Sequence, residues 1–371
     1  MSDIYGALGL NNTDNQRTFV STIGQQAIYD AVAYVFGIHN ADMESAMRLF
    51  VDQTTDSFKM RYMLPGGGYL QKGGSQSLPA VKKATGSWDV AFPLESWGAG
   101  LSADRVAWAY MTLADLDRHL NSVFMANANT VRREILRALF NNTAATFSDP
   151  LRGDLTIQRL ANNDGTVYPP VLGSDVDTTG YNAYLASGYV YTAIDNTHNP
   201  IPTIVNSLEQ FFGTPTGGSP VVVFCNNEES PFFEALTEFV PFTLNTVIPG
   251  DDRDTVNVGS IPREVFDPSD PRRNTWRVLG TINGAVIVEW RAIPATYLLG
   301  IHVEAPKPII QRIDLAGTGL TPGLQLVKTN DVTPFTSSYY DNRFGMGVGN
   351  RLNGVVMQLT AGAYSVPAQF A

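Results

Sequence analysis

Residues 57–111 constrain the fold of this chain most, because they predict a long hairpin with a glycine-rich tip that leads toward a very long helix. Large apolar residues alternate with polar or small ones in both arms: Phe58, Met60 and Tyr62 in the outgoing arm, and Trp88, Val90, Phe92 and Leu94 in the return arm. This period of two is typical of strands that bury one face. Pro93 cannot donate to a ladder, so it confines the return arm to a sheet edge or a bulge.

The tip of this hairpin, PGGGYLQKGGSQS, contains Tyr69 and is too rich in glycine and polar residues to pack on itself. A lone two-stranded hairpin is marginally stable in water, so its apolar face needs a cover. An arm of this length reaches about 50 Å at roughly 3.3 Å per residue, which is past the body of its own domain. We therefore expect a neighbouring copy to cover it, and we assign the apolar residues of both arms and Tyr69 to an interface between subunits.

Composition favours a folded protein without a broad basic surface. The 371 residues are 44% hydrophobic, enough for two or three domains with cores of their own, and the net charge of −10 argues against nucleic-acid binding through a wide basic face. The single cysteine, Cys225, lies in an apolar run, so we expect a buried reduced thiol and no disulfide. There is no signal peptide and no apolar run of about 18 residues, which predicts a cytosolic product without a membrane span.

Two helices are expected before the hairpin. Apolar residues recur at helical spacing over residues 24–36, and Gly37 is expected to end that helix. Asn40 is a good N-cap, so a second helix is predicted from there to about residue 51.

The longest predicted element is a helix over residues 112–142. Thr112 and Asp115 match a capping box at its start. Its apolar stripe recurs in steps of three and four and includes Leu113, Leu120, Phe124, Ile135 and Leu139. At 1.5 Å per residue the helix would be about 46 Å long, which suits the spine of a wide, flat molecule. The arginines on its other face favour a solvated surface over a nucleic-acid contact.

The second half of the chain is predicted to hold irregular strands and loops over residues 144–190 and an α/β part after them. The expected elements of that part are a helix at 202–212, a buried strand at 221–225, a helix at 230–239 and a hairpin at 276–291. The hairpin turns at Asn283-Gly284, the strongest short-range turn signal in the chain. Residues 249–274 predict a polar, proline-rich surface loop.

No arrangement of residues points to a catalytic, cofactor or metal site. The four histidines are far apart, and none belongs to a metal-binding pattern such as HExxH. The glycine-rich tip has the wrong spacing for a phosphate-binding loop. The acidic run at 251–254 lacks the alternating ligands and the final glutamate of a calcium loop. We therefore expect no enzyme activity, no cofactor and no metal ion.

The order of these elements resembles that of the major capsid proteins of tailed bacteriophages, which have the Hong Kong 97 type fold. The resemblance covers nearly the whole chain and includes the return arm DVAFPLES that leads into the long helix and the closing segment GNRLNGVVMQLTAGAYSVPAQF. It implies an α+β fold with four parts: an N-terminal arm at 1–51, an extended loop at 53–101, a peripheral domain at 102–189 and 346–371 that includes the spine helix, and an axial domain at 190–345.

The resemblance implies a structural role. Copies would form pentamers and hexamers that close an icosahedral shell, the virion capsid, around double-stranded DNA that is enclosed without sequence-specific binding. The chain would be made in the host cytoplasm and would work with separate scaffolding and portal proteins and with cement or decoration proteins. An extended loop laid over the next subunit would bury the apolar face that its own chain leaves bare.

Two other interpretations stay open at this point. An encapsulin-type nanocompartment protein has the same fold, although such chains are typically shorter than this one. A two-domain α+β hydrolase would instead use the hairpin as a lid over its own pocket and would be a monomer.

Covalent linkage of the shell is a separate question that the resemblance raises. Some relatives join a lysine of the extended loop to an asparagine of a neighbour, assisted by a carboxylate. Lys72, Lys82 or Lys83 could supply the amine, and Asn350 or Asn353 the acceptor. Residues 344–371 contain no acidic residue, so we expect a shell held together without covalent links.

Overall fold

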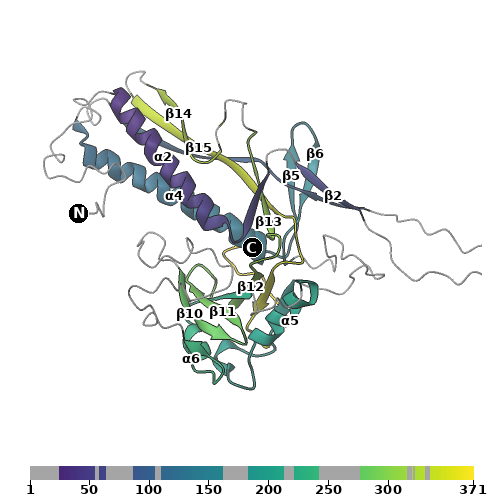
Figure 1. The fold of residues 1–371 in the computed structure, drawn as a ribbon. Helices are drawn as coiled ribbons and strands as arrows, with labels where there is room; N and C mark the ends of the chain where they lie inside the picture. The colour runs from purple at the N-terminus through teal and green to yellow at the C-terminus, as the bar shows by residue number, and fades with distance from the viewer. Residues whose placement is uncertain are drawn as a thin grey trace, which may run out of the picture.

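Two β-sheets organise the chain, one backed by a pair of long helices and the other by short helices (Figure 1). The computed structural model describes residues 25–54, 58–63, 87–104, 110–161, 183–212, 221–241, 276–315, 320, 322–330 and 335–371. The arm before Gln25, the hairpin tip with Tyr69 and the polar loop at 249–274 lie outside the described residues.

The first sheet is built around one long strand, β15. Its five strands are β1 (Val51–Thr54), β4 (Glu95–Asp104), β13 (Ile309–Ile313), β14 (Gln325–Asn330) and β15 (Phe335–Val348). β13 and β14 pair with successive parts of β15, while β4 pairs antiparallel with the stretch from Phe335 to Phe344. β15 therefore holds segments from distant parts of the sequence in one layer.

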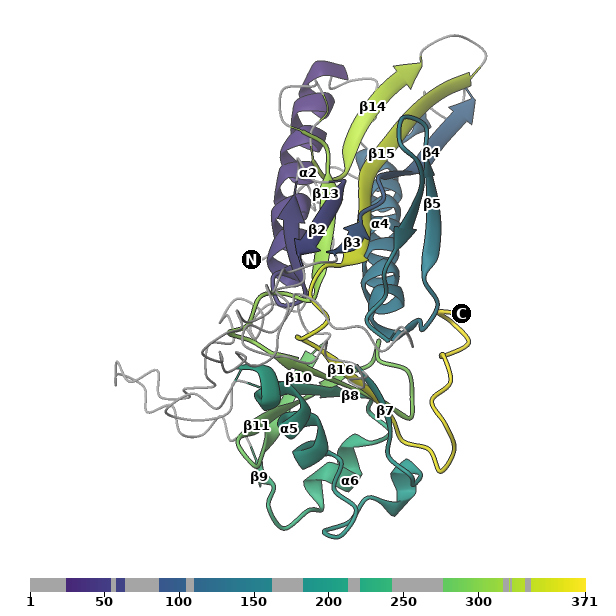
Figure 2. The same cartoon turned by 90° about the vertical axis from the view of Figure 1, so that its right-hand side faces the viewer.

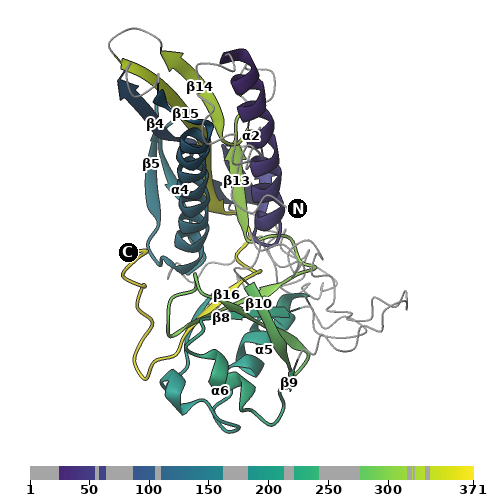
Figure 3. The ribbon, with the colours of Figure 1, turned by 90° about the vertical axis from the view of Figure 1, so that its left-hand side faces the viewer.

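Two helices, α2 (Gln25–Met47) and α4 (Leu113–Phe140), pack together against this sheet (Figures 2 and 3). α4 confirms the predicted spine helix, including its capping box: Thr112 Oγ1 accepts from the Asp115 N–H at 3.2 Å. At 1.5 Å per residue, α4 is about 42 Å long. Phe36 of α2 packs edge-to-face on Phe124 of α4 with ring centroids 5.1 Å apart, so α2 covers the N-terminal half of the spine helix.

The predicted helix break at Gly37 is wrong, because α2 is a single helix. Glycine weakens a helix by about 1 kcal/mol relative to alanine, and the burial of Phe36 before it and of Met47 after it outweighs that cost. Asn40 does not cap a helix either. Its side chain donates to the Leu324 carbonyl at 3.0 Å and accepts from the Leu324 N–H at 2.9 Å, which ties α2 to the segment before β14.

The second sheet has seven strands in the order β7-β16-β12-β8-β11-β10-β9. These strands are β7 (Tyr184–Ala186), β8 (Val221–Cys225), β9 (Val240–Pro241), β10 (Trp276–Ile282), β11 (Ala285–Trp290), β12 (Tyr297–His302) and β16 (Val355–Gln358). α5 (Ile201–Phe212) packs against β8, β12 and β16, and the short helices η2 (Tyr191–Ala193) and α6 (Ser230–Glu234) accompany it. This sheet contains most of the α/β part that the sequence predicts.

The predicted strand, hairpin and thiol of this part are confirmed. Asn283 and Gly284 take positive φ values of 49° and 81° between β10 and β11, the conformation that a two-residue hairpin turn requires. All of β8 is buried, and burial raises the pKa of the Cys225 thiol well above its ordinary value. The predicted helix at 230–239 is too long. After Glu234 the chain continues in tight turns, in which Leu236 N–H donates to the Phe233 carbonyl at 3.2 Å.

The sheets divide the chain differently from the predicted domains. β13, β14 and most of β15 were expected in the axial domain, yet they form the sheet that α4 backs. β7 and β16 were expected in the peripheral domain, yet they pair within the seven-stranded sheet. The chain changes sheets between β12 and β13 and again between β15 and β16. Local sequence patterns do not indicate these changes of sheet, because the alternation of apolar and polar residues in a strand is the same in either sheet.

Replacing Gly37 by Ala should raise the free energy of unfolding by about 1 kcal/mol, because a Cβ there meets no atom within 4 Å and alanine favours a helix. Gly354→Ala is the matched control. Gly354 has a φ of 126° and a Cβ there would lie 2.8 Å from Leu160, so this change should lower the free energy of unfolding. Urea unfolding followed by circular dichroism measures both. A loss of stability in Gly37→Ala would contradict a continuous α2.

Candidate functional site at the root of the hairpin

The hairpin predicted from the sequence is confirmed at its root, the part nearest the body. β2 (Lys59–Met63) and β3 (Ser87–Ala91) pair antiparallel, with Met60 opposite Val90 and Tyr62 opposite Trp88. The two strands lie beside β13 and β15, and β2 extends toward one edge of the body (Figures 1 and 2). The root therefore sets where the chain departs toward the tip.

The apolar face of this root packs on its own chain. Val90 and Phe92 are 0% exposed and form a cluster with Met60, Tyr62 and Ile310. The Tyr62 hydroxyl also donates to the Gly349 carbonyl at 2.5 Å. A side chain with no exposed surface offers nothing to a second copy. The assignment of Val90 and Phe92 to an interface between subunits is therefore wrong, because β13 and β15 already cover that face.

Three alternate glycines of the segment after Phe344 make this close packing possible. A Cβ on Gly345 or Gly347 would meet β3 or the link after it, and a Cβ on Gly349 would meet Ile310 of β13, whereas Met346 and Val348 between them are buried in the core that contains α4. A Cβ on Gly347 would lie 2.9 Å from the Ala91 carbonyl oxygen and from the Phe92 ring. Sequence reasoning missed this feature, although the alternation in RFGMGVGN is a signal of close backbone approach.

The other residues predicted to lie at the interface differ in their burial and in whether the structure describes them. Phe58 is half-buried beside Leu155 and Ile157, with the guanidinium of Arg152 3.5 Å above its ring centroid. Leu94 is half-buried in the link between β3 and β4. Tyr69 and the side chain of Trp88 lie outside the described residues, so their place at an interface stays a prediction.

The polar face of the hairpin is held by one carboxylate and two cations. Asp89 accepts from Arg61 Nε at 2.7 Å and lies 2.7 Å from Lys59 Nζ. The hydrogen bonds from Arg61 and Lys59 hold the pKa of the Asp89 carboxyl well below its ordinary value. These ion pairs link β2 to β3 on the solvent-facing side. Both faces of the root are therefore held by contacts within the chain.

The predicted stripe of the spine helix contributes to the chain's own cores. Leu120 and Phe124 pack with residues of α2 in one cluster, and Ile135 and Leu139 belong to the largest core. Leu113 begins α4, and its side chain lies outside the described residues. On the opposite side, Arg118, Arg132 and Arg133 are exposed, which agrees with a solvated face.

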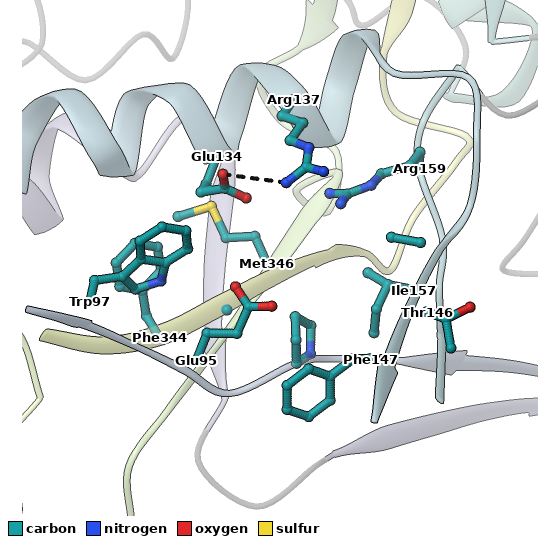
Figure 4. Close-up of a pocket in the computed structure, with 13 residues that line it drawn as sticks. Glu95, Trp97, Glu134, Arg137, Thr146, Phe147, Ile157, Arg159, Phe344 and Met346 are labelled. Carbon is teal, nitrogen blue, oxygen red and sulfur yellow. Dashed lines mark ion pairs between the residues drawn. The ribbon is translucent and has the colours of Figure 1, made fainter. Parts of the chain in front are cut away.

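A small cavity of about 130 Å³ lies beside the hairpin root, between the link to β4, the last turns of α4, β15 and the hairpin of β5 (Ala145–Asp149) and β6 (Gly153–Ile157). Its polar lining includes Glu95, Trp97, Glu134, Arg137 and Arg159 (Figure 4). Glu134 and Arg137 form an ion pair with 3.8 Å between oxygen and nitrogen. Burial, followed by the nearby Glu134, raises the pKa of Glu95. No sequence motif marked this group.

The two asparagines considered for covalent linkage are engaged within the chain. Asn350 is buried, and its side-chain amide donates to the Pro306 carbonyl at 2.8 Å. Asn353 is 0% exposed and donates to the His302 and Pro306 carbonyls, both at 2.9 Å. Both amides hold the turn between β12 and β13 in place.

The described residues contain no cluster of three histidine, cysteine or acidic side chains placed to hold a metal ion. Among the helices in those same ranges, none is long and apolar enough to cross a bilayer.

Comparison with family models and with curated proteins gives no match to this sequence. Comparison with solved structures does give matches. The chain is similar to a chain of Mycobacterium phage Patience, with a TM-score of 0.66 and 19% identity over 96% of this chain and 94% of that one. This likeness shows the fold alone, and it confirms the predicted α+β fold of the Hong Kong 97 type.

Two further solved structures are more distantly similar. One is the capsid of Myoviridae phage XM1, with a TM-score of 0.47 and 8% identity over 84% of this chain and 90% of that one. The other is the mature capsid of bacteriophage PhiM1, with a TM-score of 0.49 and 8% identity over 84% of this chain and 85% of that one.

Replacing Gly347 by Ala should lower the free energy of unfolding by about 1–3 kcal/mol, since the added methyl would press on the Ala91 carbonyl and the Phe92 ring. Gly100→Ala on β4 is the control, because a Cβ there would make an ordinary contact 3.6 Å from the Tyr339 ring. The midpoint of urea unfolding at an unchanged m-value compares the two. Equal midpoints would contradict the close passage of the root over β15.

Proposed function

We propose that this chain is the major capsid protein of a tailed phage and that its role is structural. The observation that carries the proposal is the likeness of its fold, over 96% of its length, to a chain of Mycobacterium phage Patience. The predicted order of N-terminal arm, extended hairpin, spine helix, strand-rich part and α/β part supports the same family. The role follows from self-assembly and requires no catalytic group.

The structure of the hairpin root supports an assembly role and limits the part of the hairpin that can contact a neighbour. The root is held from both sides, by the glycines after Phe344 and by the Asp89 ion pairs. A firm root fixes the direction in which an arm can reach a neighbour. Because Val90 and Phe92 belong to the chain's own core, contact with the neighbour is made nearer the tip of the hairpin, in the part that includes Tyr69 and Trp88.

Repetition of one such contact generates rings. A contact in which one surface of a subunit meets a different surface of the next is heterologous, and it closes when the rotation between subunits divides a full turn. In the proposed shell these rings are pentamers and hexamers, and together they form an icosahedral particle. The wall of this shell would enclose double-stranded DNA without sequence-specific binding. Each chain contributes the exposed arginines of α4 and a net charge of −10 to that wall.

The proposed shell needs partners that act at other stages. A scaffolding protein would guide assembly, a portal protein would admit the DNA, and cement or decoration proteins would bind outside. The chain would be made in the host cytoplasm and would end in the virion capsid.

Expression of the chain with its phage's assembly factors should yield closed particles of megadalton mass, and free capsomers should contain five or six copies. Light scattering gives the mass, and negative-stain electron microscopy gives the shape. A stable monomer at micromolar concentration would contradict the proposal and favour a lidded hydrolase. Particles filled with enzyme cargo and lacking DNA in the infected host would instead indicate a nanocompartment.

Particles boiled in detergent should run as a single band near 40.4 kDa on a denaturing gel. The expectation rests on the amides of Asn350 and Asn353, which are buried and hydrogen-bonded within the chain, and on the absence of an acidic residue over 344–371. Removal of Lys72, Lys82 and Lys83 together should leave the band pattern unchanged. A ladder of covalent pentamers and hexamers would overturn the expectation of a non-covalent shell.

A further inference from the structure

Two segments that carry the chain from one sheet to the other are joined by hydrogen bonds. The first, 303–308, connects β12 to β13, and the second, 349–354, connects β15 to β16. The side-chain amides of Asn350 and Asn353, in the second segment, donate to the Pro306 carbonyl of the first at 2.8 and 2.9 Å. The two segments therefore form one junction between the sheets.

His302, the last residue of β12, lies at the start of this junction and is only 3% exposed. Its backbone N–H donates to the Asn353 side-chain oxygen, and its carbonyl accepts from the Asn353 side-chain nitrogen, both at 2.9 Å. Its ring nitrogen Nδ1 accepts from the Ala305 N–H at 3.2 Å. His302 thus binds the second segment through its backbone and closes a turn of the first segment through its ring.

The His302 ring can close this turn only when it is neutral. A backbone N–H is always a donor, so the Nδ1 atom that faces Ala305 carries no proton, and the hydrogen bond assigns the ring proton to Nε2. A second proton, on Nδ1, would place two donors against each other and leave a positive charge in a buried site. Protonation of His302 is therefore incompatible with the closed turn.

Burial and the surrounding charges act on the His302 ring in opposite directions. Burial has the largest effect and lowers the pKa of His302. The carboxylates of Glu304 in the first segment and Glu209 on α5 raise this pKa, the Lys307 ammonium lowers it, and the net shift is downward. Asn353, which contributes the second segment's hydrogen bonds to His302, carries no charge.

A lowered pKa in the folded chain fixes the sign of the pH dependence. Histidine in an unfolded chain has a pKa of about 6.5, so the open or unfolded form binds a proton before the closed form does as the pH falls. The stabilisation by neutral His302 is complete above about pH 6.5 and is lost as the pH falls below that value.

We propose that His302 makes the junction between the sheets sensitive to acid: its neutral ring keeps the 303–308 segment closed, and protonation of the ring opens that segment and loosens its contact with 349–354. One proton is bound on opening, so the equilibrium constant for opening rises by up to tenfold per pH unit below about pH 6.5. This property belongs to the single chain and does not require the proposed shell.

Hydrogen exchange of the purified protein, measured by mass spectrometry from pH 8 to pH 5.5 and corrected for the intrinsic exchange rate, tests the proposal. Amides of 302–308 and 349–354 should lose protection below about pH 6.5, by up to tenfold per pH unit. Amides of the β5–β6 hairpin are the internal control, because local opening there leaves His302 folded. Protection of the junction that stays constant over this range, or that falls no more than in the β5–β6 hairpin, would overturn the proposal.

His302→Asn separates the ring's charge from its hydrogen bond. Asparagine Oδ1 can accept from the Ala305 N–H in place of Nδ1 and cannot become charged. The junction of this variant should have equal protection at pH 5.5 and pH 8, even where the smaller side chain lowers protection throughout. His198→Asn is the matched control, since His198 is exposed and its ring lies 3.1 Å from Asp195. Dependence on pH that persists in His302→Asn, or that disappears in His198→Asn, would contradict the role of His302.

Glu304→Gln tests the sign of the effect at an exposed position and does not depend on the folding of His302→Asn. The Glu304 carboxylate favours the protonated His302 ring, so its removal should move the onset of opening to lower pH at low salt. An onset that is unchanged or moves to higher pH would count against His302 as the titrating group.

Discussion

The close passage of the hairpin root over β15 is the contact on which the first layer of the molecule depends. On one face of this strand, Gly345 and Gly347 carry no side chain, which lets the backbone of β3 and the link after it lie against the strand. The other side carries Met346 and Val348 into the core with α4. A single strand thus fixes the hairpin and the spine helix relative to one another, because each side chain of a strand faces only one side of the sheet.

The spine helix connects the two halves of the molecule through different neighbours along its length. Its N-terminal half packs with α2, and its C-terminal half belongs to a core that also contains Phe224 and Trp290 of the seven-stranded sheet. A buried polar link lies between these halves, where Asn342 donates to Asn127 at 2.7 Å and Asn127 lies 3.1 Å from His39. Polar atoms buried in this way fix the relative positions of α2, α4 and β15, since each needs its partner.

Sequence patterns do not distinguish residues of the chain's own core from residues of an assembly surface, and only the tertiary structure separates the two. Alternation in the hairpin arms predicted correctly that Met60, Tyr62, Val90 and Phe92 share one face. It carried no information on what covers that face, because burial by a neighbour and burial by a distant strand of the same chain leave the same pattern. The cavity is a parallel case: Arg159 and Trp97 are ordinary residues in the sequence, and only folding places both beside Arg137 and Glu134.

Local signals in the sequence determined the elements whose causes are local. The capping box at Thr112 and the stripe after it determined the spine helix, and Asn283-Gly284 determined a hairpin turn, because these signals act within a few residues. Only the tertiary structure decided that α2 continues through Gly37, since the packing of Phe36 on α4 outweighs a weak local preference. It likewise decided which sheet receives each strand, because pairing partners far apart in the chain leave no mark on local sequence.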